Sequence, residues 1–239
     1  MIFIAEFGSN PAPSWDFEAF CAAARRAGAT YGKVQIWSTD AIYPESMRDD
    51  RRPLEFPRNR FAEFVEACRS HDLRPMASVF DIEAVSMVSM YPCAFKLAAS
   101  RWDQQALLFY AREQAARLGR ELFRTSENLT RDDEWQHGLT AEVPFATVAE
   151  YPVGMGRAID AVISAADAFR DAGTPTWGWS SHTAAPGWVD VALADYLGAE
   201  FCEKHFCLSH DEPEGAHSLT ESEFADLVRR VNGPKGRDR

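Results

Sequence analysis

The chain has 239 residues, of which 46% are hydrophobic and 26% are charged, and its formal net charge is −11. This composition is typical of a folded globular protein with a sizeable core. The acidic balance, with no stripe of Lys and Arg, argues against nucleic-acid binding, and no apolar run approaches the ~20 residues needed to cross a bilayer. Because the N-terminal stretch MIFIAEF carries no basic leader, we expect a soluble, cytoplasmic protein that does not bind membranes.

Short strand-like runs alternate with amphipathic helical runs along the chain. In chain order, strands are predicted at 2–7, 33–37, 74–80, 94–99, 121–125, 144–148, 176–180 and 199–206. Helices with an apolar stripe at helical spacing are predicted at 17–28, 60–70, 103–119, 155–173, 189–199 and 220–233. The stretch 126–143 has no such stripe, so we expect a short or missing helix there.

This alternation of strand and helix favours parallel pairing with right-handed crossovers. Eight units of about 30 residues match the ~250 residues typical of a (β/α)8 barrel. An open, doubly wound sheet is the alternative, but the glycine fingerprint that such a sheet carries after its first strand is absent. We therefore predict an α/β protein with a (β/α)8 TIM barrel over residues 1–232 as one domain, followed by a flexible tail at 233–239.

Polar and titratable residues gather at the C-terminal ends of the predicted strands. Side chains alternate faces along a strand, so residues two positions apart share a face. The residues that this rule or their position at a strand end brings to one rim are Glu6, Lys33, Gln35, Ser78, Lys96, Arg124, Ser180, His182, Glu203 and His205. Barrel enzymes place their chemistry at this rim. Cationic side chains there suit phosphate or carboxylate oxygens, and two imidazoles suit a divalent metal.

The stretch AEFCEKHFCLSHDEPEGAH, residues 199–217, is rich in cysteine and histidine and raises the question of a zinc knuckle. In the predicted strand, Cys202 and His205 lie on opposite faces, which prevents them from converging on one tetrahedral ion. His205 is therefore the candidate ligand. We expect Cys207, His210 and His217 to be loop residues outside the metal site.

Six motifs, in order along the chain, resemble those of the N-acetylneuraminate (sialic acid) synthase family. They are IAEFGSN, GKVQIW, ASVFDIEAV, FKLAAS, WSSHT and FCEKHF. The resemblance runs from about residue 3 to residue 231. It implies a metal-dependent barrel enzyme that condenses phosphoenolpyruvate with an aldehyde sugar.

The resemblance also implies roles for individual residues. His182 and His205 would bind the metal, typically manganese in this family, and Glu214 falls near the acidic residue of a family loop. The candidate catalytic residues are Glu6, Lys33, Lys96 and Arg101; the candidate substrate-binding residues are Gln35, Ser78, Arg124, Ser180, Glu203 and Glu214; the candidate metal ligands are His182 and His205. Small-molecule substrates are the expected partners, and a homodimer is compatible with the sequence.

The chain departs from the family pattern at several positions. Arg101 stands where the family carries its acid/base glutamate, Arg124 replaces a serine, Ala149 an asparagine and Ser181 an aspartate. The antifreeze-like domain that follows the barrel in sialic acid synthases is also expected to be absent. Because arginine stays protonated at any working pH, Arg101 is unable to take over the proton transfer of a glutamate.

Three functional hypotheses follow from these departures. The first is a condensing enzyme of the sialic acid synthase type with an altered acceptor or mechanism. The second is a non-catalytic barrel that acts as a binding or partner subunit in a glycan pathway. The third is a metal-dependent sugar-phosphate lyase or isomerase, in which Arg101 and Arg124 hold the substrate phosphate. The sequence favours the first because Lys33, Lys96 and both imidazoles are present.

Overall fold

The computed structural model describes residues 1–101, 104–126 and 142–233, and its strands form a closed parallel barrel in the order β1 to β8. The strands are β1 Ile2–Glu6, β2 Tyr31–Ile36, β3 Arg74–Val79, β4 Ala94–Leu97, β5 Leu122–Ser126, β6 Glu142–Thr147, β7 Gly178–Ser181 and β8 Phe201–His205. Closure occurs where β1 pairs with β8, with Glu6 opposite His205. The predicted (β/α)8 barrel is confirmed, and the alternative of an open sheet is excluded.

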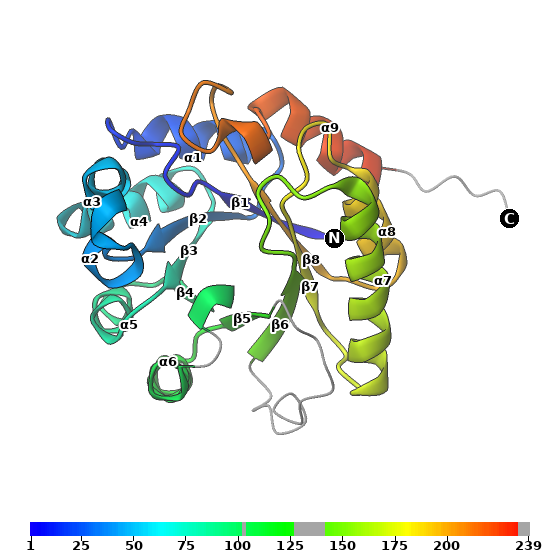
Figure 1. Cartoon of the computed structure of the whole chain (residues 1–239), viewed down its shortest axis with the longest axis horizontal. Helices are drawn as coiled ribbons and strands as arrows, with labels where there is room; N and C mark the ends of the chain where they lie inside the picture. Colours follow the sequence, from blue (N-terminus) through cyan, green and yellow to red (C-terminus); the bar gives the residue numbers. More distant parts are fainter. Residues whose placement is uncertain (102–103, 127–141, 234–239) are drawn as a thin grey trace, which may run out of the picture.

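Helices surround the barrel on its outside (Figure 1). They are α1 Phe17–Arg26, α2 Thr39–Ile42, α3 Glu45–Arg51, α4 Phe61–Ser70, α5 Ile82–Ser89, α6 Gln105–Leu118, α7 Met155–Asp171, α8 Val189–Tyr196 and α9 Glu221–Asn232. Short 3-10 turns are η1 Arg52–Leu54, η2 Arg58–Arg60, η3 Ala99–Arg101 and η5 Gly215–His217. Of the stretch predicted to lack a regular helix, 127–141 lies outside the described residues, as does 234–239 of the predicted tail. Within the described ranges, no helix is long and apolar enough to span a membrane.

Local sequence signals begin and end these helices. The Asp16 side chain accepts a hydrogen bond from the Ala19 backbone N–H at the start of α1. Thr220 and Glu223 form a capping box at the start of α9. Gly119 ends α6 with φ 62°, a left-handed conformation that glycine adopts without a Cβ penalty.

The interior of the barrel holds an apolar layer to which seven of the strands contribute buried side chains. These residues are Ile4, Tyr31, Met76, Ala94, Phe123, Phe145 and Phe201. Strand β7 contributes Gly178 at this level, and a Cβ there would lie 2.3 Å from the Cζ atom of Phe145. The absent side chain of Gly178 therefore makes room for the Phe145 ring.

A polar layer lies two residues further along each strand, toward the C-terminal ends. Because the side-chain period is two, this step keeps the residues inside the barrel. The layer consists of Glu6, Lys33, Ser78, Lys96, Thr125, Thr147, Ser180 and Glu203. The apolar layer thus lies deeper in the barrel, and the polar layer lies between it and the C-terminal mouth.

Candidate active site

A cavity of about 250 Å³ opens at the C-terminal mouth of the barrel. Most of the residues predicted for the site line it, namely Glu6, Lys33, Gln35, Ser78, Lys96, Ser180, His182, Glu203 and His205. Because the barrel is closed, the C-terminal ends of its eight strands meet at this mouth, together with the loops that follow them. Residues that are distant in the sequence therefore become neighbours. The structure therefore brings together both lysines and both imidazoles of the predicted site.

Two buried lysines share one glutamate at the bottom of this cavity. The Nζ atom of Lys96 lies 2.5 Å from Glu203 Oε2, and the Nζ atom of Lys33 lies 3.0 Å from the same oxygen. Lys33 also forms an ion pair with Glu6. Ser180 donates a hydrogen bond of 2.9 Å to the other oxygen of Glu203. Glu203 is thus the residue that holds the two ammonium groups side by side.

Burial and pairing shift the pKa values of these groups in different directions. Burial lowers the pKa of Lys96 to about 8, because the attraction of Glu203 only partly offsets the loss of water. Burial also acts against the charge of Lys33, but Glu203 and Glu6 together raise its pKa above the usual value. For Glu203, burial is outweighed by the two ammonium groups, which lower the pKa of the carboxyl. Of the two lysines that share Glu203, Lys96 is therefore the one with the lower pKa.

The two predicted metal ligands lie side by side, with ring centroids 5.4 Å apart. His182 Nδ1 lies 2.6 Å from the carbonyl oxygen of Val148. A carbonyl only accepts, so this nitrogen carries the hydrogen and Nε2 keeps its lone pair. His205 Nδ1 lies 2.7 Å from Glu214 Oε2 in the same kind of arrangement. A second partner that orients an imidazole in this way is typical of histidines that bind metals, so the pair fits a divalent cation.

Glu214 lies behind His205 and outside the wall of the cavity. Its Oε1 accepts hydrogen bonds from the Ser9 backbone N–H at 2.9 Å and from the Ser9 hydroxyl at 2.6 Å. Burial would raise the pKa of Glu214, but the hydrogen bonds from His205 and Ser9 lower it to about 2. Glu214 therefore orients the His205 imidazole, and it is not among the residues that line the cavity.

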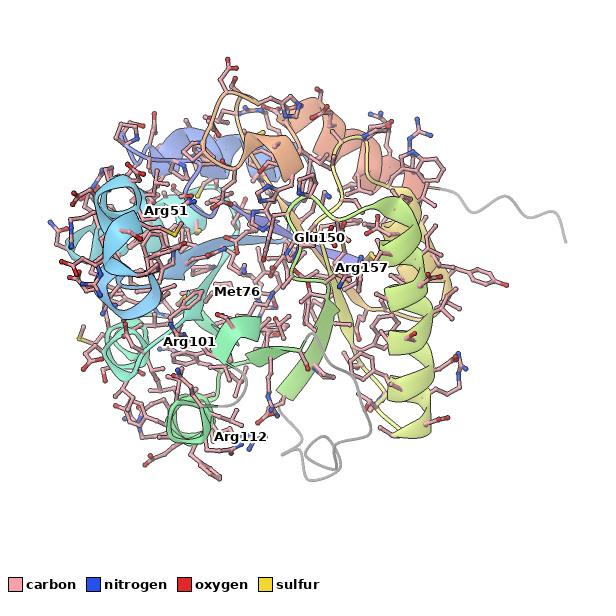
Figure 2. The ribbon with its side chains drawn as sticks, in the orientation of Figure 1. Arg51, Met76, Arg101, Arg112, Glu150 and Arg157 are labelled. Atoms are coloured by element: carbon pink, nitrogen blue, oxygen red, sulfur yellow. The ribbon has the colours of Figure 1, made fainter. Side chains whose placement is uncertain are left out.

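The structure does not bring the two arginines of the predicted site into the cavity. Arg124 alternates with Phe123 and Thr125, which face the barrel interior, so Arg124 points toward the helix layer and the expected placement at the rim is wrong. Arg101 lies on the turn η3 (Figure 2), where Ala98, Ala99 and Ser100 line the cavity and Arg101 does not. Neither arginine is among the described residues that line this cavity.

Several residues that the sequence did not single out belong to this region. Thr125 and Thr147 line the cavity, and Tyr151 lies over the imidazoles with its ring centroid 4.1 Å from that of His182. His217, expected outside the metal site, lies with its ring centroid 4.6 Å from that of His205. The period-two pattern was sufficient to find Thr125 and Thr147. No periodic signal marks Tyr151 or His217, because both are loop residues.

The fold and this site together define a class of protein. A (β/α)8 barrel with ammonium and imidazole groups converging at its C-terminal mouth has the arrangement that barrel enzymes use. The sequence matches the NeuB family over residues 20–122 and 136–235, and the chain belongs to that family. This match confirms the resemblance to sialic acid synthases that the six motifs indicated.

Solved structures of related barrels support the fold. The chain is similar to N-acetylneuraminic acid (sialic acid) synthetase from Leptospira borgpetersenii serovar Hardjo-bovis, with a TM-score of 0.82 and 21% identity, over 100% of this chain and 87% of that one. It is similar to a spore coat polysaccharide biosynthesis protein from Bacillus subtilis, with a TM-score of 0.77 and 24% identity, over 97% and 67%. A truncated 3-deoxy-D-arabino-heptulosonate 7-phosphate synthase from Thermotoga maritima matches with a TM-score of 0.71 and 13% identity, over 97% and 85%. No match was found among curated proteins.

Proposed function

We propose that this chain condenses phosphoenolpyruvate with an aldehyde sugar, using a divalent cation held by His182 and His205. The observation that carries the proposal is the convergence of two buried ammonium groups and two imidazoles on one cavity in a member of the NeuB family. Related barrels named as a sialic acid synthetase and as a heptulosonate phosphate synthase support a sugar-acid product.

Lys33 and Lys96 are the groups that would hold the phosphate and carboxylate of phosphoenolpyruvate. Both are buried, and Lys33 also donates a hydrogen bond of 2.9 Å to the Ser78 hydroxyl. Glu203 keeps the two ammonium groups in position, so little rearrangement is needed when an anion arrives. Preorganised charge of this kind in a cavity of low dielectric is the main source of electrostatic stabilisation in enzymes.

His182 and His205 would hold the cation through their Nε2 atoms, because each Nδ1 is engaged by a hydrogen-bond acceptor. A bound divalent cation would supply Lewis-acid polarisation of the aldehyde carbonyl. Manganese is the metal that the family resemblance implies. Gln35, with its amide 3.2 Å from Glu6 Oε2, and Glu6 itself lie at the part of the cavity where the acceptor sugar would bind.

A non-catalytic binding barrel is a second candidate, and one observation favours it. Among the described residues, the carboxylates that line the cavity are Glu6 and Glu203, and both are ion-paired with lysine. Neither is therefore an obvious replacement for the acid/base glutamate of the family, whose position is occupied by Arg101. The lyase or isomerase alternative loses support because Arg124 faces the helix layer.

The proposal is tested by combining a binding and a turnover measurement. Calorimetry with phosphoenolpyruvate in the presence of manganese is expected to show binding that Lys96→Met removes. Arg74→Met, at the opposite end of the barrel, removes the same charge and is expected to leave the binding unchanged. Phosphate release from phosphoenolpyruvate with a panel of aldehyde sugars then separates the two candidates. Binding without phosphate release supports the non-catalytic barrel, and the absence of both contradicts the proposed function.

A further inference from the structure

A third buried lysine, Lys204, lies behind the strand ends that carry the two imidazoles, and the proposed function does not use it. Lys204 alternates with Glu203 and His205 on β8, so its side chain faces the helix layer while theirs line the cavity. Its exposed fraction is 0%. Its Nζ atom donates hydrogen bonds to the Ser181 hydroxyl at 3.2 Å, to the Thr183 hydroxyl at 3.2 Å and to the Thr183 carbonyl. All three acceptors are neutral, although a buried ammonium is costly without a counter-charge.

Asp190 on α8 supplies this counter-charge through one intervening hydroxyl. The exposed fraction of Asp190 is also 0%, and its Oδ1 accepts a hydrogen bond of 3.3 Å from the Thr183 hydroxyl that accepts one from Lys204. Its Oδ2 accepts a hydrogen bond of 2.8 Å from the Trp179 indole N–H. Burial lowers the pKa of Lys204 to about 8, and the charge of Asp190 opposes part of that fall. Lys204, Thr183 and Asp190 thus form a buried polar chain from β8 to α8.

This polar chain holds the backbone on both sides of His182. The last pair in the ladder between β7 and β8 is Ser181 with Lys204, so His182 lies one residue beyond the ladder. On the β6 side, the Val153 backbone N–H donates a hydrogen bond of 3.0 Å to the His182 carbonyl. On the β8 side, the Lys204 side chain binds Ser181 and Thr183, the residues immediately before and after His182. The position of the imidazole therefore depends on the Lys204 side chain.

The loop between β7 and α8 packs closely over the same groups. Gly187 has φ +21°, and a Cβ there would lie 2.5 Å from Thr183 Oγ1 and 3.2 Å from Lys204 Nζ. The loop backbone therefore covers the ammonium group and leaves no room for a side chain at position 187. A polar group enclosed in this way depends on its protein partners in place of water.

We propose that Lys204 and Asp190 are positioning residues that fix the His182 imidazole at the cavity. The proposal rests on the proposed function for the use of His182, whereas the polar chain requires no ligand. It also accounts for one departure from the family pattern. Ser181 stands where that pattern has an aspartate, and a carboxylate at this position would lie directly opposite Lys204. In this chain the counter-charge comes from α8.

The test measures, by NMR, the solvent exchange of the His182 Nδ1 proton in the metal-free, full-length chain. This proton is bonded to the Val148 carbonyl, and its signal is assigned by its loss in His182→Ala. Asp190→Asn keeps the shape of the side chain but leaves Lys204 without its counter-charge. It is expected to speed this exchange at least about tenfold and to weaken Mn²⁺ binding, measured by calorimetry, about 10-fold to 100-fold. Asp167→Asn, at an exposed carboxylate on α7, is the control and is expected to change neither.

A second substitution separates the loss of charge from disturbed packing. Ser181→Asp in the Asp190→Asn background places a carboxylate beside Lys204, so both measurements are expected to return to within about threefold of the wild type. Thr183→Val removes the linking hydroxyl and keeps the shape of the side chain. It is expected to speed the exchange about threefold to tenfold, and it decides the question if Asp190→Asn does not fold.

Three results would overturn the positioning role. The first is exchange at the wild-type rate in Asp190→Asn or, where this variant does not fold, in Thr183→Val. The second is faster exchange shared equally by the backbone amides of β3, across the barrel, which would indicate a general loss of stability. The third is a folded double variant in which Ser181→Asp restores nothing. The exchange measurement needs neither metal nor phosphoenolpyruvate, so a wild type that binds no Mn²⁺ would contradict the proposed function and leave the positioning role to be decided by exchange.

Discussion

Lys96 and Glu203 form a buried ion pair at the bottom of the cavity, with Nζ and Oε2 2.5 Å apart. The same glutamate oxygen lies 3.0 Å from the Nζ atom of Lys33. Glu203 therefore compensates charge on both buried ammonium groups, and Glu6 shares in the compensation of Lys33. The stability of the barrel is expected to depend on this arrangement, as is the anion binding of the proposed function.

Glu203→Gln removes the charge that compensates both lysines and keeps the shape of the side chain. Breaking a buried ion pair by removing one partner typically costs about 3–5 kcal/mol, so we expect a loss of this size in the free energy of unfolding. Chemical denaturation at pH 7 measures it. Glu221→Gln, which breaks an exposed pair with Arg26, is the control and is expected to cost less than about 1 kcal/mol. Equal losses in the two variants would contradict the role assigned to Glu203.

Binding of phosphoenolpyruvate is expected to weaken as pH rises above about 8, where Lys96 loses its proton. The decline approaches tenfold per pH unit while the free lysine is neutral and the bound one charged. Calorimetry at several pH values measures this decline. Lys96→Arg keeps its charge throughout this range and is expected to show a much flatter profile. A wild-type affinity that is constant through pH 9 would show that Lys96 does not hold the anion.

The lowered pKa of Lys96 also has a consequence for stability. The pKa falls from 10.5 in the unfolded chain to about 8 in the folded one. Between these values the unfolded chain binds more protons, so the contribution of Lys96 to the free energy of unfolding rises with pH. Comparing denaturation at pH 8 and pH 10 in the wild type and in Lys96→Met isolates this term. From pH 8 to pH 10, the free energy of unfolding of the wild type is expected to rise relative to that of Lys96→Met.

Gly8→Ala is expected to displace Glu214 from His205. Gly8 has φ +53°, and a Cβ there would lie 2.1 Å from Glu214 Oε2. Loss of this orienting carboxylate is expected to lower Mn²⁺ or Co²⁺ affinity about 10-fold to 100-fold, as measured by calorimetry. Gly119→Ala is the matched control, because Gly119 has φ +62° and open space around it. The control is expected to lose stability from the strained backbone but to bind the cation normally.

Gly178→Ala is expected to destabilise the barrel by about 1–3 kcal/mol, because the new methyl group meets the Phe145 ring at 2.3 Å. Thermal or chemical unfolding measures the loss. Gly156→Ala, a position in α7 with open space around it, is expected to be neutral or stabilising. Phe145→Leu in the Gly178→Ala background is expected to recover part of the loss. Additive effects of the two changes would show that they do not interact.

Most of the barrel and much of its site could be predicted from the sequence because both follow a periodic pattern. Polar residues two positions beyond buried apolar ones mark the inner face of each strand, and this pattern predicts Lys33, Lys96 and Glu203 in one cavity. The same pattern predicts that Arg124 faces outward, because the residues on either side of it, Phe123 and Thr125, face the barrel interior.

The sequence by itself determined the order of the elements, the closed parallel sheet and the inward set of side chains, since alternation along a strand is a local property of the backbone. Only the tertiary structure decided that Glu214 lies behind His205 and that His217 and Tyr151 lie beside the imidazoles. Loops have no fixed period. Their side chains are placed by contacts with distant segments, such as those of Ser9 with Glu214, and these contacts exist only once the barrel has closed.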